Sequence, residues 1–232
     1  MSVFVLASGA WCGGWLWKRV RDRLTAKGHQ VFTPTLTGLA ERSHLLSRDV
    51  GLATHIDDIA NLLIWEELND VVLVGHSYSG VVVRHVADRM PDRIRTLIYL
   101  DAFVPEDGKC LMDYQPDGGD RIRVAAASQG EGWKVPPMPP SILGVNAADG
   151  AWMERQYTMH PLSTLTTPAK ITGACDRVRS IGYVAARGWQ SHVASFYEVA
   201  GDRGWWRSEL QCGHIPMLDE PDELTELLLQ RA

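Results

Sequence analysis

The residues best placed to do chemistry surround Ser77. An apolar segment at 71–74 runs into the turn Gly75-His76-Ser77-Tyr78-Ser79-Gly80, and a helix-like apolar segment follows directly. This order of strand, tight turn and helix is the context in which a G-x-S-x-G pattern presents a nucleophilic serine. Ser79 replaces the second glycine of the pattern, but serine is small and Gly80 follows it. We therefore predict that Ser77 is a nucleophile; the alternative is an ordinary turn with an incidental serine.

A serine needs a base, and the base must be held by a third group. In this arrangement an acid and then a histidine follow the serine along the chain. His214 lies in a Gly-His loop between a short strand-like stretch and the last helical segment, from which it can reach back over the serine. His160 and His192 also follow the serine, but they lie in a loop-rich stretch and a helical pattern, and we interpret both as structural. The predicted base is His214.

Two aspartates could orient the base. Asp176 follows the apolar segment 169–174, which we expect to be a late parallel strand. The carboxyl ends of parallel strands meet at the crevice where ligands bind. We therefore predict that Asp176 accepts the imidazole Nδ1–H and stabilises the imidazolium. Asp101 follows the segment 94–100 and is the alternative acid; its other interpretation is a residue that caps a turn.

Backbone N–H groups must stabilise the negative charge that develops on the substrate oxygen. The residue after the nucleophile, Tyr78, is one predicted donor. Ala10, in the glycine-rich turn 8–14 that follows the first predicted strand, is the other. The alternative is an ordinary strand-to-helix turn. That turn lacks the glycine patterns that bind phosphate or dinucleotides, so we expect no cofactor.

Composition narrows the class of protein. The chain has 232 residues, enough for one domain spanning 1–232. Its net charge of −5 gives no electrostatic footprint for nucleic acid or an acidic membrane. No segment is long and apolar enough to span a membrane, and 1–10 is expected to be a buried strand rather than a signal peptide. The four cysteines, far apart along the chain, predict neither a metal site nor disulfides and suit a reducing cytoplasm.

Apolar runs alternate with amphipathic segments along most of the chain. We expect strands at 3–7, 71–74, 94–100 and 169–174, and helices at 15–26, 52–67, 80–90 and 221–230. This alternation predicts an α/β fold with a mainly parallel sheet and helices on both faces. The alternation of strands and helices is interrupted at about 104–165 by a loop-rich stretch. We expect this stretch to form a short cap excursion over one edge of the sheet.

At the predicted catalytic residues and in the segments around them, the chain resembles the small α/β-hydrolases, the group that includes plant methylesterases, plant hydroxynitrile lyases and bacterial esterases. The resemblance runs nearly end to end and rests on segments 4–15, 28–31, 75–80, 101–105 and 212–214, with 35–45 similar to the bacterial branch. It implies the α/β-hydrolase fold, a triad of Ser77, Asp176 and His214, and an oxyanion hole from Ala10 and Tyr78.

The chain departs from these relatives at three positions. Ser8 stands where many carry a histidine, which changes the polarity near the predicted oxyanion hole. Ile215 and Gly9 occupy the positions of the lysine and threonine of the hydroxynitrile lyases. The charge that handles cyanide is therefore absent, and lyase chemistry is disfavoured.

Aromatic residues and methionines of the cap predict an apolar pocket for an aryl or alkyl group. They are Met112, Tyr114, Trp133, Met138, Trp152, Met153 and Tyr157, and the residues we expect to bind substrate are Trp11, Trp133, Trp152 and Met217. The alternative is that they only pack the cap onto the body.

The predicted function is therefore cleavage of a small carboxylic ester through an acyl-enzyme. Carbamates, lactones and amides would use the same triad. A lyase, a cofactor-free oxygen-using enzyme and a small-molecule binding protein are the alternatives.

Overall fold

A computed structural model describes residues 1–191 and 193–232, so His192 lies outside the described residues. Its central sheet has six parallel strands in the order β2-β1-β3-β4-β7-β8. They are β1 (Val3–Ala7), β2 (Gln30–Phe32), β3 (Val71–His76), β4 (Ile94–Leu100), β7 (Ser180–Ala186) and β8 (Trp206–Leu210). The predicted parallel sheet is confirmed.

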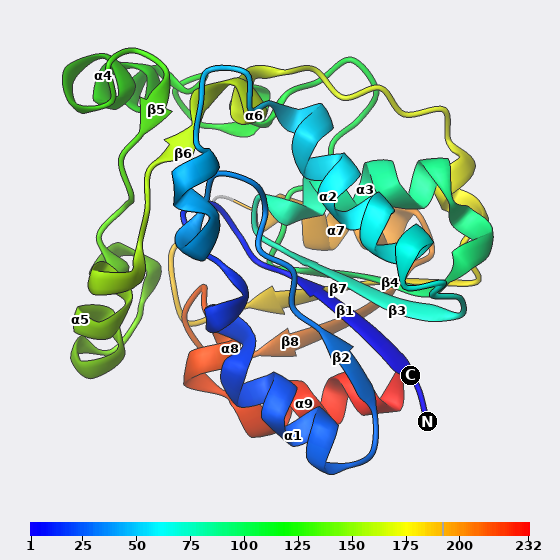
Figure 1. Cartoon of the computed structure of the whole chain (residues 1–232). Helices are drawn as coiled ribbons and strands as arrows, with labels where there is room; N and C mark the ends of the chain where they lie inside the picture. The colour runs from blue at the N-terminus through cyan, green and yellow to red at the C-terminus, as the bar shows by residue number, and fades with distance from the viewer. Residues whose placement is uncertain (192) are drawn as a thin grey trace.

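Helices cover both faces of this sheet (Figure 1). One face carries α2 (Leu52–Trp65), α3 (Ser79–Arg89) and α7 (Ser195–Asp202), and the other carries α1 (Lys18–Ala26), α8 (Pro216–Asp219) and α9 (Pro221–Gln230). Side chains alternate across a strand, so Leu73 packs against the first helical layer and Val72 against the second. Strands buried on both sides explain the continuous apolar runs of the sequence.

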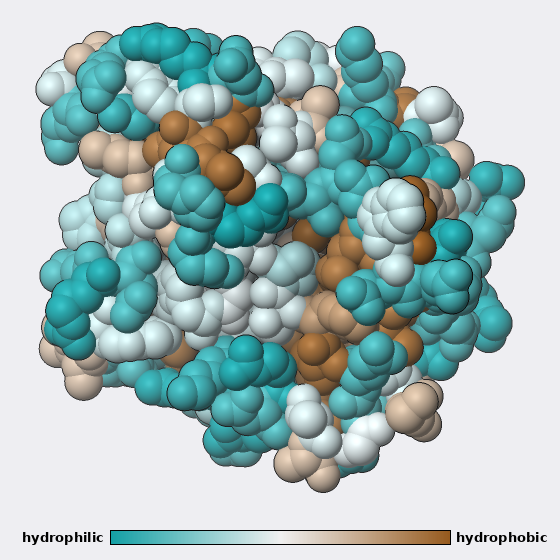
Figure 2. Space-filling model, in the orientation of Figure 1, coloured by the Kyte–Doolittle hydropathy of each residue, from teal (hydrophilic) through white to brown (hydrophobic). Residues whose placement is uncertain are grey.

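The cap leaves the sheet after β4 and returns before β7. It contains α4 (Asp120–Gln129), β5 (Lys134–Val135), α5 (Ala147–Gln156), β6 (His160–Pro161) and α6 (Leu162–Thr166), and β5 pairs with β6 in an antiparallel ribbon. These green and yellow-green segments lie at the edge of the sheet where the parallel strands end (Figure 1). In the same orientation, Figure 2 shows a mainly hydrophilic face with hydrophobic side chains gathered into separate patches.

Six short 3₁₀ turns complete the described elements. They are η1 (Gly14–Trp17), η2 (Ala40–Leu45), η3 (Pro91–Arg93), η4 (Leu111–Tyr114), η5 (Pro140–Leu143) and η6 (Ala174–Arg177). The helix expected at 15–26 therefore begins as a 3₁₀ turn and becomes α-helical at Lys18.

The strand expected at 169–174 is absent, and that prediction is wrong. The backbone N–H groups of Ile171 and Thr172 donate to the carboxylates of Asp107 and Asp88 instead of to a neighbouring strand. Gly173 then turns the chain with φ 92°, and the sheet resumes only at β7. The error matters for the site, because it places Asp176 before a strand and not after one.

The four cysteines are free thiols. Across 1–191 and 193–232, no helix combines the length and apolarity needed to cross a bilayer. The same residues contain no group of three or more His, Cys, Asp or Glu side chains that could hold a metal ion.

Candidate active site

Ser77 sits at a sharp turn between β3 and α3. Its φ is 54°, in the left-handed region that a non-glycine residue rarely adopts. Two glycines allow the close packing that this turn needs. A Cβ on Gly75 would lie 2.4 Å from Val83 Cγ2, and a Cβ on Gly80 would lie 2.2 Å from the Phe103 carbonyl oxygen. The turn therefore holds Ser77 in the strained conformation typical of a nucleophile elbow.

Ser77, His214 and Asp101 form a chain of hydrogen bonds. His214 Nε2 lies 2.9 Å from Ser77 Oγ, and His214 Nδ1 lies 2.7 Å from Asp101 Oδ2. A carboxylate can only accept, so Nδ1 carries the imidazole hydrogen and Nε2 is free to accept the serine hydroxyl. This is the proton arrangement that a serine nucleophile and its general base require.

Asp101 is buried but has a full set of donors. Its side chain is only 1% exposed. Besides His214, the Ala186 N–H donates to Oδ1 at 3.2 Å and the Trp189 indole donates to Oδ2 at 2.9 Å. These hydrogen bonds offset the free-energy cost of removing the carboxylate from water. Asp101 also has a positive φ of 42°, so the tip of β4 is strained in the same sense as the tip of β3.

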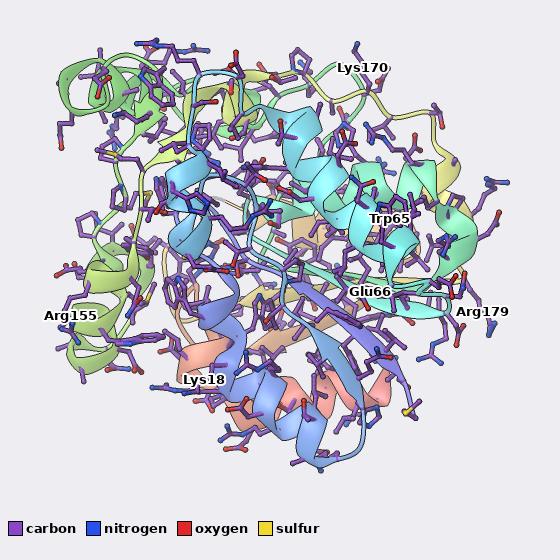
Figure 3. The ribbon with its side chains drawn as sticks, viewed as in Figure 1. Lys18, Trp65, Glu66, Arg155, Lys170 and Arg179 are labelled. Carbon is purple, nitrogen blue, oxygen red and sulfur yellow. The ribbon has the colours of Figure 1, made fainter. Side chains whose placement is uncertain are left out.

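Asp176 does not reach the base, and the prediction that it orients His214 is wrong. Its carboxylate is 45% exposed and lies 3.7 Å from Arg84 and 3.8 Å from Arg203. Asp176 precedes β7, whose seven residues span roughly 20 Å. Figure 3 labels the nearby Arg179 on the side of the molecule opposite Arg155 of the cap. Asp176 is therefore at the edge where the strands begin, and Asp101, at the end of β4, occupies the place of the acid.

The loop that carries His214 is fixed on both sides. The His214 N–H donates to the Leu143 carbonyl of the cap at 2.8 Å, and His76 Nε2 donates to the His214 carbonyl at 2.7 Å. The Gly213 N–H donates to Asp219 Oδ2 at 3.1 Å. His76 is completely buried, and this burial, aided by the neighbouring His214, keeps the pKa of His76 well below its ordinary value. His76 is thus a neutral donor that holds the base loop.

The predicted oxyanion donors come together beside Ser77. Ala10, in the turn after β1, and Tyr78, at the start of α3, line the same cavity as Ser77. A Cβ on Gly9 would lie 2.9 Å from Ser77 Cβ, so glycine is needed for this close approach. Their roles as donors stay predictions, since an oxyanion forms only during reaction.

Ser79 has a role that the sequence pattern did not reveal. Its hydroxyl donates to the Ser8 carbonyl oxygen, and the Ser8 hydroxyl donates to the Gly13 carbonyl at 2.7 Å. The residue that replaces a glycine in the elbow therefore ties α3 to the turn that carries Ala10.

A cavity of about 90 Å³ opens onto Ser77 and His214. The other residues that line it are mostly apolar, and His76 and Gln115 are among the polar exceptions. They come from the turn 8–14, the turn around Ser77, the cap, the segment after β7 and the loop that carries His214: Gly9, Ala10, Trp11, Cys12, His76, Tyr78, Phe103, Leu111, Gln115, Ile122, Met138, Leu143, Tyr157, Leu165, Trp189, Val193 and Ile215. Of the four residues predicted to bind substrate, the structure places Trp11 in this wall, together with Met138 and Tyr157 of the cap hypothesis.

Trp133, Trp152 and Met217 do not line the cavity, and these predictions are wrong. Trp133 packs under Arg48, whose guanidinium lies 5.2 Å from the ring centroid. Trp152 packs edge-on against Trp15, with centroids 4.9 Å apart. Met217 is fully buried in the core on the α1 side of the sheet. Each side chain packs against other parts of the protein instead of facing the cavity beside Ser77.

Sequence reasoning missed Trp189 and most of the apolar wall. Trp189 and Val193 follow β7, a strand that the sequence analysis did not expect, and so their position at the carboxyl edge of the sheet was not anticipated. Leu111 and Ile122 lie in the cap without a local pattern that separates them from packing residues.

The parallel sheet, the elbow serine and the His–Asp pair define a hydrolase of the α/β type. The chain matches the sequence model of the alpha/beta hydrolase family over residues 4–227 and belongs to that family. It is 39% identical to the carbendazim hydrolyzing esterase of Nocardioides sp. (strain SG-4G), over 98% of both chains. It is 31% identical to methylesterase 8 of Arabidopsis thaliana, over 44% of this chain and 38% of that one.

Solved structures share the fold. An extracellular alpha/beta-hydrolase from a Paenibacillus species aligns with a TM-score of 0.88 at 20% identity, covering 100% of this chain and 99% of that one.

Proposed function

We propose that this chain cleaves small apolar or aromatic carboxylic esters through an acyl-enzyme on Ser77. It is a hydrolase acting on ester bonds, in keeping with its esterase relative at 39% identity. The observation that carries the proposal is the continuous chain from Ser77 Oγ to His214 (2.9 Å) and from His214 to Asp101 (2.7 Å), set at the mouth of an apolar cavity.

The geometry supports a two-step reaction. Ser77 Oγ attacks the ester carbonyl carbon while its proton passes to His214 Nε2, and the Ala10 and Tyr78 N–H groups stabilise the oxyanion. The tetrahedral intermediate collapses as His214 gives its proton to the departing alcohol. Water then attacks the acyl-enzyme with His214 again acting as base, which releases the acid and restores Ser77.

The cavity favours a small group. An engineered cavity of about 150 Å³ in another protein holds benzene, and this one measures about 90 Å³, so we expect an aromatic group of the ester to lie on the alcohol side, at the mouth of the cavity. A short acyl or alkyl group fits this space without movement of the cap. We therefore expect turnover of p-nitrophenyl esters to fall as the acyl chain lengthens from acetate to hexanoate.

One experiment tests the chemistry. Purified protein and a Ser77→Ala variant are incubated with a fluorophosphonate, and intact mass is recorded beside p-nitrophenyl acetate hydrolysis. A single adduct on the wild type, absent from the variant and matched by a loss of turnover of up to about 10⁶-fold, supports the proposal. Ester turnover that survives Ser77→Ala would show that another residue is the nucleophile.

A second experiment tests the pocket with a control on the same helix. Ile122 of α4 lines the cavity, whereas Val124 of α4 is 66% exposed. Ile122→Ala is expected to raise the turnover of hexanoate relative to acetate several-fold, and Val124→Ala to leave that ratio unchanged. An unchanged ratio in both variants would place the acyl group elsewhere.

Hydroxynitrile lyase activity is disfavoured at this site. Ile215, directly after the base, is buried and lines the cavity as an apolar residue. Mandelonitrile cleavage at a rate above that of ester hydrolysis would contradict the esterase assignment.

A further inference from the structure

The cap holds Trp11 at each of its polar groups. The Trp11 N–H donates to His160 Nδ1 at 3.4 Å, its carbonyl accepts from the Thr158 N–H at 3.2 Å, and its indole donates to the Val135 carbonyl at 3.0 Å. Trp11 adopts φ 64°, a conformation that persists only where surrounding contacts enforce it. Because Ala10 directly precedes Trp11, these bonds also restrain the turn that carries the Ala10 N–H.

Hydrogen-bond partners determine which nitrogen of His160 carries the hydrogen. The Thr164 hydroxyl donates to the Pro161 carbonyl at 2.8 Å, so it can only accept from His160 Nε2, which lies 2.8 Å away. Nε2 therefore carries the hydrogen, and Nδ1 keeps the lone pair that accepts the Trp11 N–H. Complete burial, together with the nearby His55, holds the pKa of His160 well below its ordinary value.

A second buried histidine supports the other predicted oxyanion residue. His55 Nε2 lies 2.9 Å from the Thr37 carbonyl oxygen, so this nitrogen donates, and His55 Nδ1 accepts the Tyr78 hydroxyl at 2.8 Å. The Tyr78 ring meets the His55 and His160 rings nearly edge-on, with centroids 5.8 Å and 4.7 Å apart. Both turns that carry the predicted oxyanion donors therefore rest on one layer of buried rings.

We propose that His160 is a positioning residue for the oxyanion hole, with its Nδ1 accepting the Trp11 N–H and so aiming the Ala10 N–H at the substrate oxygen. This inference rests on the proposed esterase function. His160 lies in β6 of the cap, so the cap both lines the cavity and restrains the turn 8–14 that carries Ala10. Loss of the bond between His160 and the Trp11 N–H would weaken binding of the transition state and not of the substrate. We therefore expect kcat to fall while KM stays the same.

Two substitutions at this position separate the acceptor from the donor. In His160→Asn the side-chain oxygen takes the place of Nδ1 and still accepts from Trp11, whereas His160→Gln keeps a donor near Nε2 and loses that acceptor. Removal of one oxyanion donor costs about 10²–10³ in kcat, and a displaced turn is expected to cost less. We expect about a 10- to 100-fold lower kcat in His160→Gln, under about threefold in His160→Asn, and unchanged KM in both.

The control is His44→Gln at an exposed histidine, which is expected to leave kcat unchanged. An equal loss in the Asn and Gln variants would overturn the proposal, since the acceptor would then not matter. If His160→Gln does not fold, the inhibitor comparison in His160→Asn and the tautomer measurement on the wild-type protein test the proposal in its place.

Inhibitor affinity gives a readout that a general structural defect would not move. A short alkyl trifluoromethyl ketone adds to Ser77 and forms an oxyanion, whereas a product carboxylate does not. Ki for the ketone is expected to rise by the same factor as kcat falls in His160→Gln, with Ki for the carboxylate unchanged. An unchanged ketone Ki would contradict a role at the oxyanion hole.

The tautomer can be measured on the wild-type protein even if esterase activity fails. In a ¹⁵N-histidine NMR spectrum, His160 is expected to be neutral with its hydrogen on Nε2. A hydrogen on Nδ1 would overturn the proposal on its own. Absence of ester turnover and of a Ser77 adduct, with the expected tautomer present, would instead count against the proposed function.

Discussion

Trp189 Nε1 lies 2.9 Å from Asp101 Oδ2, the same carboxylate oxygen that accepts the His214 Nδ1–H at 2.7 Å. The indole also packs against the imidazole, with ring centroids 4.4 Å apart, and lines the cavity. One oxygen thus serves two donors. The strength of this oxygen as an acceptor for the His214 Nδ1–H therefore depends on a tryptophan that lines the cavity.

Trp189→Phe should expose this dependence. Without the indole, Asp101 Oδ2 loses one of its two donors, and the His214 ring loses the surface that it packs against. Both groups are then held less firmly, and we expect kcat at pH 7 to fall about tenfold. Steady-state kinetics measure this change. Trp152→Phe, away from the cavity, is the control, and a kcat in Trp189→Phe equal to that of the control would contradict the interpretation.

The two candidate acids make a matched pair. Asp101→Asn is expected to lower kcat by about 10⁴-fold, because the amide favours the wrong imidazole tautomer. Asp176→Asn removes the carboxylate near Arg84 and Arg203 and should leave kcat within about twofold. Steady-state kinetics on both variants test this, and the reverse pattern would restore Asp176 as the acid.

Ser79→Ala tests the bond between the elbow and the oxyanion turn. It removes the hydroxyl that donates to the Ser8 carbonyl, a bond expected to contribute about 1 kcal/mol to stability. We expect a lower melting temperature and a several-fold lower kcat. Ser79→Gly restores the strict motif but also lacks the hydroxyl. A gain of activity in that variant would show that the motif glycine matters more than the bond.

Buried histidines should make the fold sensitive to mild acid. Burial lowers the pKa of His55 and, more strongly, of His76 and His160. The unfolded chain then binds more protons than the folded one, so these groups cost no stability above the ordinary histidine pKa of about 6.5 and destabilise the fold as pH falls below it.

The expected slope is about 1.4 kcal/mol per pH unit for each such histidine. Urea unfolding at pH 7, 6 and 5 measures it. His160→Asn should make the loss of unfolding free energy between pH 6 and 5 shallower by about that amount. An equal slope in variant and wild type would mean that His160 titrates normally.

The sequence by itself predicted the elements that depend on local signals. The apolar runs that became β1, β3 and β4 are buried on both faces, and the strand-turn-helix pattern at Ser77 is built from neighbouring residues. His214 could be selected because a single Gly-His loop precedes the last helix. The structure confirms that Ser77 and His214 lie within hydrogen-bond distance of each other.

Only the tertiary structure decided the acid and the pocket. Asp101 and His214 are 113 residues apart, and both aspartates follow an apolar run. The choice depended on whether 169–174 joins the sheet, which is a matter of pairing between distant segments. Likewise, their apolar side chains predict that Trp133 and Trp152 are packed against other residues. Which residues they contact, Arg48 and Trp15 rather than the cavity, depends on how the cap folds onto the sheet. Local sequence therefore determined the nucleophile turn, and long-range packing determined what surrounds it.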